Sequence, residues 1–277
     1  MPEDGTKLPF LNKPNHLNFQ EFYHPLIDIV QKASKAILKV YEDPTRFAVN
    51  YKEDNSPLTA ADQASNLIIC ENLENLYPEI PIISEENRNV DYSERSGYDY
   101  CWMVDPLDGT KEFVKRNGEF TINIALIHQG ESVLGIMHIP VTGVSFLASK
   151  GDTAYIWKDD HLSGIRCRSY DHTSIGLGLV CSRSHLNDAT RSYVDQYEQP
   201  VMVPKGSALK FTVIAMGEAD IYPRLGPTME WDTAAAQIIL ESAGGKVLDF
   251  ETRMPLRYNK PNLLNPNFIA CGDGEIY

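Results

Sequence analysis

Apolar residues recur at helical spacing in the first part of the chain. Residues 19–41 place them three and four positions apart, which predicts an amphipathic helix. A second segment with the same period starts after Thr59 and stops before Pro78. Thr59 has the side chain of a helix N-cap, and Asp62 falls in the first turn that follows it. Two helices are therefore expected before any strand.

The period then changes to that of strands. Residues 80–84 and 100–104 are short apolar runs, and each leads directly into carboxylates, Glu85-Glu86 after the first and Asp105 after the second. Residues 119–157 are apolar stretches broken by glycines and a proline, which is typical of an antiparallel meander. Carboxylates that follow two strands predict a shared acidic site at the strand ends.

The second half of the chain alternates between strand and helix patterns. Strands are expected near residues 177–181, 201–203, 220–222, 246–248 and 268–271, and helices near 187–197, 207–216 and 232–243. A polar stretch at 168–173 separates this α/β alternation from the meander. We therefore expect an N-terminal α+β domain at residues 1–170 and a C-terminal α/β domain at residues 171–277 that contains Asp232.

Composition narrows the class of protein. The chain has 277 residues, of which 43% are hydrophobic and 23% charged, as in ordinary globular proteins. No run approaches the roughly 20 apolar residues of a membrane helix, and the first residues lack the order of a signal peptide. The five cysteines are widely spread without a Cys-x-x-Cys pair, which argues against a disulfide framework and a zinc ribbon. A cytoplasmic protein is expected, with peripheral membrane association left open.

The formal charge of −13 disfavours nucleic acid polymers and anionic lipids as partners. A small anionic ligand would need metal ions and a local basic cluster to hold it. The run Asp105-Pro106-Leu107-Asp108-Gly109-Thr110 meets the first requirement, because two carboxylates and the Leu107 carbonyl are hard oxygen ligands that suit Mg²⁺. An isolated Asp-Gly would more often be a surface turn. Here a metal site is favoured over a surface turn, because an apolar strand leads into the run and two further carboxylates, Glu85 and Asp232, are available.

The ordered set of motifs resembles the inositol monophosphatase superfamily over nearly the whole chain. The matching pieces are Leu58-Thr59-Ala60-Ala61-Asp62, Glu85-Glu86, the run 105–110 and Trp231-Asp232-Thr233-Ala234-Ala235. The resemblance implies a layered α/β/α/β/α sandwich that hydrolyses phosphate monoesters with two or three Mg²⁺ ions and is inhibited by Li⁺. It implies five metal ligands: Glu85, Asp105, the Leu107 carbonyl, Asp108 and Asp232. Asp62 and Thr110 would orient and deprotonate the attacking water.

Within that superfamily the chain resembles the bacterial 3′(2′),5′-bisphosphate nucleotidases of sulfate assimilation. The pieces that match are residues 108–113, 182–185, 205–210 and 222–224. This likeness implies adenosine 3′,5′-bisphosphate as substrate, with 3′-phosphoadenosine 5′-phosphosulfate as a second one. Lys210 and Arg224 would bind the phosphate that does not react, and Ser182 and His185 would approach the nucleoside. The implied substrate-binding set is Glu85, Leu107, Asp108, Gly109, Thr110, Ser182, His185, Gly206, Ser207, Lys210, Arg224 and Asp232.

Two other functions stay open on the sequence alone. A sugar or polyol phosphatase like inositol monophosphatase needs no second phosphate site, so Lys210 and Arg224 would then be ordinary surface or salt-bridged residues. A metal- or nucleotide-binding protein without turnover would use the carboxylates but would have no need of Asp62 and Thr110. The sequence does not rank the nucleotide substrates, and it leaves monomer and homodimer open.

Overall fold

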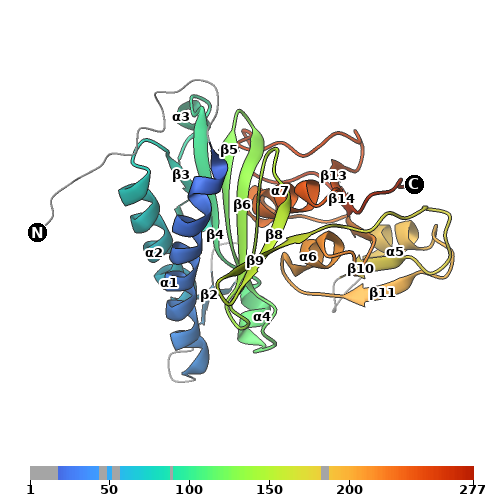
Figure 1. The fold of residues 1–277 in the computed structure, drawn as a ribbon, viewed down its shortest axis with the longest axis horizontal. Coiled ribbons are helices and arrows are strands. Elements are labelled where there is room, and N and C mark those ends of the chain that lie inside the picture. The colour runs from blue at the N-terminus through green and yellow to red at the C-terminus, as the bar shows by residue number, and fades with distance from the viewer. Residues whose placement is uncertain (1–17, 44–48, 52–56, 88–89, 182–186) are drawn as a thin grey trace, which may run out of the picture.

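The computed structural model describes residues 18–43, 49–51, 57–87, 90–181 and 187–277. Two helices, α1 (Tyr23–Glu42) and α2 (Ala60–Leu76), lie side by side along one face of a large sheet (Figure 1). Thr59 is the N-cap of α2, and its side chain and that of Asp62 form a reciprocal capping box. The two predicted helices and the predicted cap are thus confirmed. Among the described residues, no helix is both long and apolar enough to cross a membrane.

The large sheet has seven strands that lie in chain order. The strands are β3 (Ile82–Ser84), β4 (Tyr100–Asp108), β5 (Thr121–His128), β6 (Glu131–Ile139), β7 (Val144–Ser149), β8 (Ala154–Lys158) and β9 (His161–Ile165). Strands β3 and β4 pair parallel, and every later pair is antiparallel. The predicted strands and meander are confirmed, and β9 extends the meander beyond its expected end.

The second sheet has five strands in the order β11-β10-β12-β14-β13. They are β10 (Gly178–Cys181), β11 (Val201–Pro204), β12 (Ile221–Arg224), β13 (Lys246–Asp249) and β14 (Phe268–Cys271), with helices α5 (Asp188–Val194), α6 (Leu209–Ala215) and α7 (Ala234–Ser242) between them in the chain. The chain passes from one sheet to the other between residues 165 and 178. The division into two domains near residue 170 stays a prediction.

Short elements fill the connections. A two-stranded sheet joins β1 (Val49–Tyr51) to β2 (Pro57–Thr59), and the short helices are α3 (Tyr92–Arg95) and α4 (Thr110–Val114). Three 3-10 turns, η2 (Phe19–Phe22), η4 (Glu85–Asn87) and η5 (Glu230–Asp232), precede α1, follow β3 and precede α7. The turns η4 and η5 contain Glu85 and Asp232, so they help to position the candidate site.

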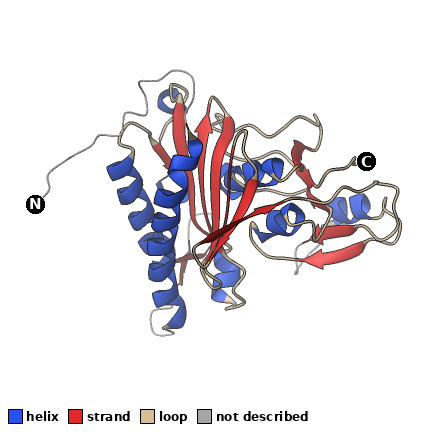
Figure 2. Ribbon diagram, in the orientation of Figure 1, coloured by secondary structure: helices blue, strands red, loops and turns tan. Residues whose placement is uncertain are grey.

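The helices and the two sheets are stacked in layers (Figure 2). Three apolar clusters of the described residues hold five such layers together. One cluster joins α1 and α2 to the seven-stranded sheet. A second fills the middle of the molecule, where α6 and α7 lie between the two sheets, and a third joins the five-stranded sheet to α5. Helix α7 is apolar on nearly all sides, as expected for a helix covered on both faces. The expected α/β/α/β/α sandwich is confirmed.

The contact between α7 and the large sheet depends on Gly135 in β6. A Cβ atom at this position would lie 2.6 Å from Cγ2 of Ile238 and 2.7 Å from the carbonyl oxygen of Ala235. Both atoms belong to α7, so the strand and the helix backbone approach more closely than any other residue allows. Asp232 lies two residues before the start of α7, so the position of this helix also affects that carboxylate.

We expect Gly135→Ala to lower the free energy of unfolding by roughly 1–3 kcal/mol, because the added methyl group overpacks the contact with α7. Thermal or urea unfolding measures this loss. Gly164→Ala is the matched control, because a Cβ at Gly164 meets nothing within 4 Å. Equal stabilities of the two variants would contradict the account of the α7 contact.

Candidate active site

Strand β4 delivers two of the candidate ligands. Its pairing with β5 is regular up to Asp105 and Asn123, and then shifts register before Asp108 pairs with Thr121. Such a shift bends a strand and redirects its side chains. Gly109 follows with φ of 92°, and a Cβ there would lie 3.0 Å from both the Glu119 carbonyl oxygen and Cβ of Ser207. The glycine is needed for its conformation and for the close approach of a second segment.

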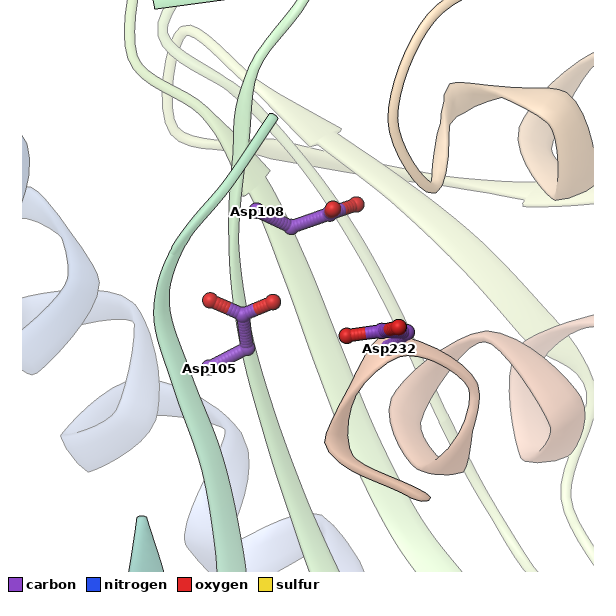
Figure 3. Close-up of side chains that lie close together, drawn as sticks. All are labelled: Asp105, Asp108 and Asp232. Carbon is purple, nitrogen blue, oxygen red and sulfur yellow. The ribbon is translucent and has the colours of Figure 1, made fainter. Parts of the chain in front are cut away.

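Asp232 reaches the same place from η5, the turn before the middle-layer helix α7. One oxygen from each of Asp105, Asp108 and Asp232 lies within 4.8 Å of the others. Figure 3 shows the three side chains turned toward a common space, two from β4 and one from the turn before α7. The backbone N–H of Met229 donates to Asp232 at 2.8 Å and that of Leu107 donates to Asp105 at 3.0 Å, so each carboxylate is held by its own turn.

Burial and neighbouring charges raise the pKa values of Asp105 and Asp232. Burial raises the pKa of Asp105 well above its usual range, and the charges of Glu85, Asp108 and Asp232 raise it further. Burial also raises the pKa of Asp232 to about 8, with Asp108 the largest charge contribution. Glu85 lies outside the group of three but close enough to act on both. A divalent cation would remove this repulsion, and a set of oxygen donors fits Mg²⁺.

Asp62 and Thr110 meet beside the three aspartates. The Thr110 hydroxyl donates to Oδ1 of Asp62 at 3.3 Å and lies 3.4 Å from the Leu107 carbonyl oxygen. The other oxygen of Asp62 accepts hydrogen bonds from the backbone N–H and the hydroxyl of Thr59, at 2.8 and 2.6 Å. Gly109, not Thr110, is the N-cap of α4. The Thr110 hydroxyl is therefore directed at Asp62 rather than used as a helix cap.

The segment before α6 closes over Asp108. The Ser207 hydroxyl donates to the Asp108 carboxylate, and the backbone N–H of Ala208 donates to the same oxygen. Ser207 has a positive φ of 50°, and the N–H of Gly206 donates to Glu119 at 2.9 Å. The backbone N–H groups of Gly206 and Ala208 thus both contact carboxylates in the structure. Gly206 and Ser207 lie near Asp108, and their part in substrate binding stays a prediction.

Lys210 and Arg224 both line a cavity of about 290 Å³. Lys210 is 8% exposed, its ammonium donates to the Ser207 carbonyl at 2.6 Å, and it lies 5.4 Å from the centre of the Tyr222 ring. Burial lowers the pKa of Lys210, the Arg224 charge lowers it further, and Asp108 acts in the opposite direction. Nε of Arg224 is buried without a hydrogen-bond partner among the described residues.

The same cavity is lined by Asp108, Gly109 and Asp232, so the acidic group and the two cations share one space. Ser182 and His185 fall outside the described residues, and their predicted role stays untested. Lining residues that the sequence did not single out include Lys111, Glu112, Thr228, Thr233 and Phe268. Lys111 and Glu112 belong to residues 108–113, a segment that resembles the nucleotidases, so the sequence could have indicated them as cavity residues. Nothing in the local sequence marks Thr228 or Phe268.

Comparison with known proteins agrees with this geometry. The model of the "Inositol monophosphatase family" matches residues 18–275. The "3'(2'),5'-bisphosphate nucleotidase CysQ" of Salmonella typhimurium is 41% identical over 240 residues, which are 87% of this chain and 95% of that protein. The protein of the same name from Buchnera aphidicola is 38% identical over 267 residues, 95% of this chain and 98% of its own.

Among solved structures, that of CysQ from Bacteroides thetaiotaomicron, described as a bacterial member of the inositol monophosphatase family, is similar throughout. Its TM-score is 0.81 and its sequence identity 38%, and the match covers 94% of this chain and 100% of that one. The likeness extends over both sheets and every layer, since it leaves out little of either chain.

We expect Asp232→Asn to become more stable relative to the unaltered protein as pH rises from about 5 to 8, in the presence of a metal chelator. An unfolded aspartate ionises near pH 3.9, whereas Asp232 in the folded, metal-free protein ionises near pH 8. The stability that this raised pKa contributes is complete below about pH 4 and is lost as pH rises toward 8. Asparagine has no such loss.

Thermal unfolding at several pH values measures the difference. Asp28→Asn, at an exposed position on α1, is the control and should show no trend. Parallel pH curves for Asp232→Asn and the unaltered protein would contradict the electrostatic account of the site.

Proposed function

The chain belongs to the inositol monophosphatase family, and on that basis we propose that it is a Mg²⁺-dependent 3′(2′),5′-bisphosphate nucleotidase. Its substrate in this proposal is adenosine 3′,5′-bisphosphate, which it converts to AMP and phosphate, with 3′-phosphoadenosine 5′-phosphosulfate as a second substrate. The observation that carries the proposal is one cavity lined both by two carboxylates of the acidic group, Asp108 and Asp232, and by two cations, Lys210 and Arg224. A bisphosphate requires carboxylates that bind metal for one phosphate and cations for the other.

Four carboxylates and one carbonyl would hold the ions: Glu85, Asp105, Asp108, Asp232 and the Leu107 carbonyl. Bound Mg²⁺ would lower the pKa of a water molecule, neutralise phosphate oxygens and stabilise the leaving alkoxide. The protein's own part is to keep the ligands fixed, which the backbone N–H groups of Leu107 and Met229 do for Asp105 and Asp232. Two or three ions are expected from the family resemblance.

Asp62 and Thr110 provide a route for a proton. The Thr110 hydroxyl donates to Asp62, which leaves the lone pairs of Oγ1 free to accept a hydrogen bond from the attacking water. A proton can then move from the water to Thr110 while the Thr110 proton moves to Asp62. The two donors of Thr59 hold the Asp62 carboxylate in place for this exchange. A protein that only bound metal or nucleotide would have no use for this pair.

Lys210 and Arg224 would bind the phosphate that does not react. Anion binding offsets the burial of Lys210 and the repulsion between the two cations, both of which lower the Lys210 pKa. It also gives a partner to Nε of Arg224. A substrate with a single phosphate would bring no anion to these two cations, and this favours the bisphosphate over an inositol or polyol phosphate. Sulfur metabolism, Li⁺ inhibition, a cytoplasmic location and the oligomeric state stay predictions.

We expect Asp105→Asn to lower kcat by roughly 100-fold or more, because loss of a metal ligand removes several kcal/mol of transition-state stabilisation. Phosphate release from adenosine 3′,5′-bisphosphate in the presence of Mg²⁺ measures the rate. The backbone hydrogen bond from Leu107 can still form to the asparagine oxygen, so the fold should be kept. Asp28→Asn is the control for a change of charge alone, and normal turnover by Asp105→Asn would refute the metal site.

We expect Lys210→Ala to lower kcat/KM on adenosine 3′,5′-bisphosphate by about 10- to 150-fold, the equivalent of about 1.5–3 kcal/mol for a charge-assisted hydrogen bond. On adenosine 3′-monophosphate, which lacks the second phosphate, the same change should cost little. Comparing the two substrates isolates the contact, as in a double-mutant cycle.

Lys210→Met is the matched variant, because it keeps most of the buried side-chain stem and removes the charge. It should show the same substrate pattern. Equal losses on both substrates would mean that Lys210 acts on the reacting phosphate or on folding. Comparable rates on adenosine bisphosphate and inositol 1-phosphate by the unaltered protein would favour the polyol phosphatase instead.

A further inference from the structure

Asn123, in the middle layer of the molecule, has a buried carboxamide without a partner. The residue lies in β5 and is 2% exposed. Neither its Oδ1 nor its Nδ2 makes a hydrogen bond to any part of the chain that the structure describes. Buried amides are nearly always hydrogen-bonded, since leaving both polar atoms unpaired costs the free energy of their lost hydration. An apolar residue would be expected here unless the amide serves a ligand.

The pairing of β4 with β5 places this amide beside the carboxylate group. Asn123 is the direct cross-strand partner of Asp105, and it is the last pair before the register shift. Directly opposed residues in an antiparallel pair project to the same face of the sheet, about 5 Å apart at Cβ. The carboxamide therefore lies on the face from which Asp105 meets Asp108 and Asp232.

The neighbours of Asn123 on that face support this position. Two residues before it, the Thr121 hydroxyl lies 3.0 Å from the Ser207 hydroxyl, and the Ser207 hydroxyl donates to the Asp108 carboxylate. Two residues after it, Ala125 belongs to the apolar cluster that also contains Trp231. Asn123 thus lies at the boundary where the core ends and the polar site begins.

We propose that Asn123 is a positioning residue of the cation site: with the cation bound, Nδ2 donates to the Asp105 carboxylate, a hydrogen bond that the structure does not contain, and Oδ1 accepts a hydrogen bond from the hydration shell of the cation. The inference rests on the proposed Mg²⁺ site. Mg²⁺ in proteins keeps several waters, whose hydrogens need acceptors. A carboxamide offers a donor to the carboxylate and an acceptor to the water from one rigid group. Groups of this kind orient metal ligands and tune metal affinity.

A purely structural asparagine would behave differently. If Asn123 only filled space, its replacement would change stability equally with and without Mg²⁺, and Mg²⁺ affinity would stay the same. A positioning residue has the opposite signature. Its loss should weaken Mg²⁺ binding, while the metal-free protein keeps its stability or gains some, since two unpaired buried polar atoms are removed.

The experiment is calorimetric titration of substrate-free protein with Mg²⁺, together with thermal unfolding in a chelator. We expect Asn123→Leu, which keeps the branched shape without polar atoms, to raise the Mg²⁺ dissociation constant by roughly 10- to 100-fold. Its melting temperature in the chelator should equal or exceed that of the unaltered protein. Asn123→Ser, which keeps one hydroxyl on the same face, should lose less Mg²⁺ affinity. If circular dichroism shows that the leucine variant is unfolded, the serine variant decides the test.

Ile122→Val is the matched control, because Ile122 is the adjacent buried residue whose side chain belongs to the cluster on the opposite face. It should bind Mg²⁺ as the unaltered protein does. Unchanged Mg²⁺ affinity in the leucine variant, or in the serine variant where that one decides, would overturn the role of Asn123. The absence of Mg²⁺ binding by the unaltered protein would instead refute the proposed metal site itself, so the two failures are distinguishable.

Discussion

Repulsion among buried carboxylates is the constraint on which the rest of this structure depends. Asp105, Asp108 and Asp232 come from segments more than 120 residues apart in the chain, yet their oxygens lie within 4.8 Å of one another. Like charges at this spacing, removed from water, oppose folding. The fold holds them together by ordinary means: pairing of β4 with β5, the close contact of Gly135 with α7, and backbone donors to each carboxylate. Cation binding would offset part of the unfavourable free energy of this repulsion.

The middle layer connects the acidic group to the cavity that Lys210 and Arg224 line. Asp108 is bound by Ser207 and Ala208, and the same short segment begins α6, where Lys210 donates back to the Ser207 carbonyl. Asp108 is therefore hydrogen-bonded directly to the start of helix α6, which carries Lys210. A change in the charge around Asp108 acts on both sides of the cavity. This physical link explains why the acidic group and the basic pair form a single site and not two neighbouring ones.

The parts of the site that follow one another in the chain could be predicted from the sequence, and the parts joined only by the fold could not. The run 105–110 showed a strand end, a turn and two carboxylates within six residues, and the helices and strands followed from periodicity. The hydrogen bonds from Ser207 and Ala208 to Asp108 span about a hundred residues, and no local pattern indicates them. Asn123 was missed for the same reason. In the sequence it is one polar position within an apolar strand, and only the β4–β5 register places it opposite Asp105.

The net charge of −13 opposes the approach of any anionic substrate, so positive charge in the cavity favours its binding. A dianionic phosphate approaching this protein meets a repulsive field at long range, and the carboxylates at the cavity wall add to it at short range. Cations bound by the carboxylates would reverse the sign of the field around those carboxylates. Lys210 and Arg224 line the same cavity, and the charge of Arg224 disfavours that of Lys210, which a bound anion would offset. The site therefore has two separate reasons to bind an anion, and a substrate with two phosphates satisfies both at once, whereas one with a single phosphate relieves only one.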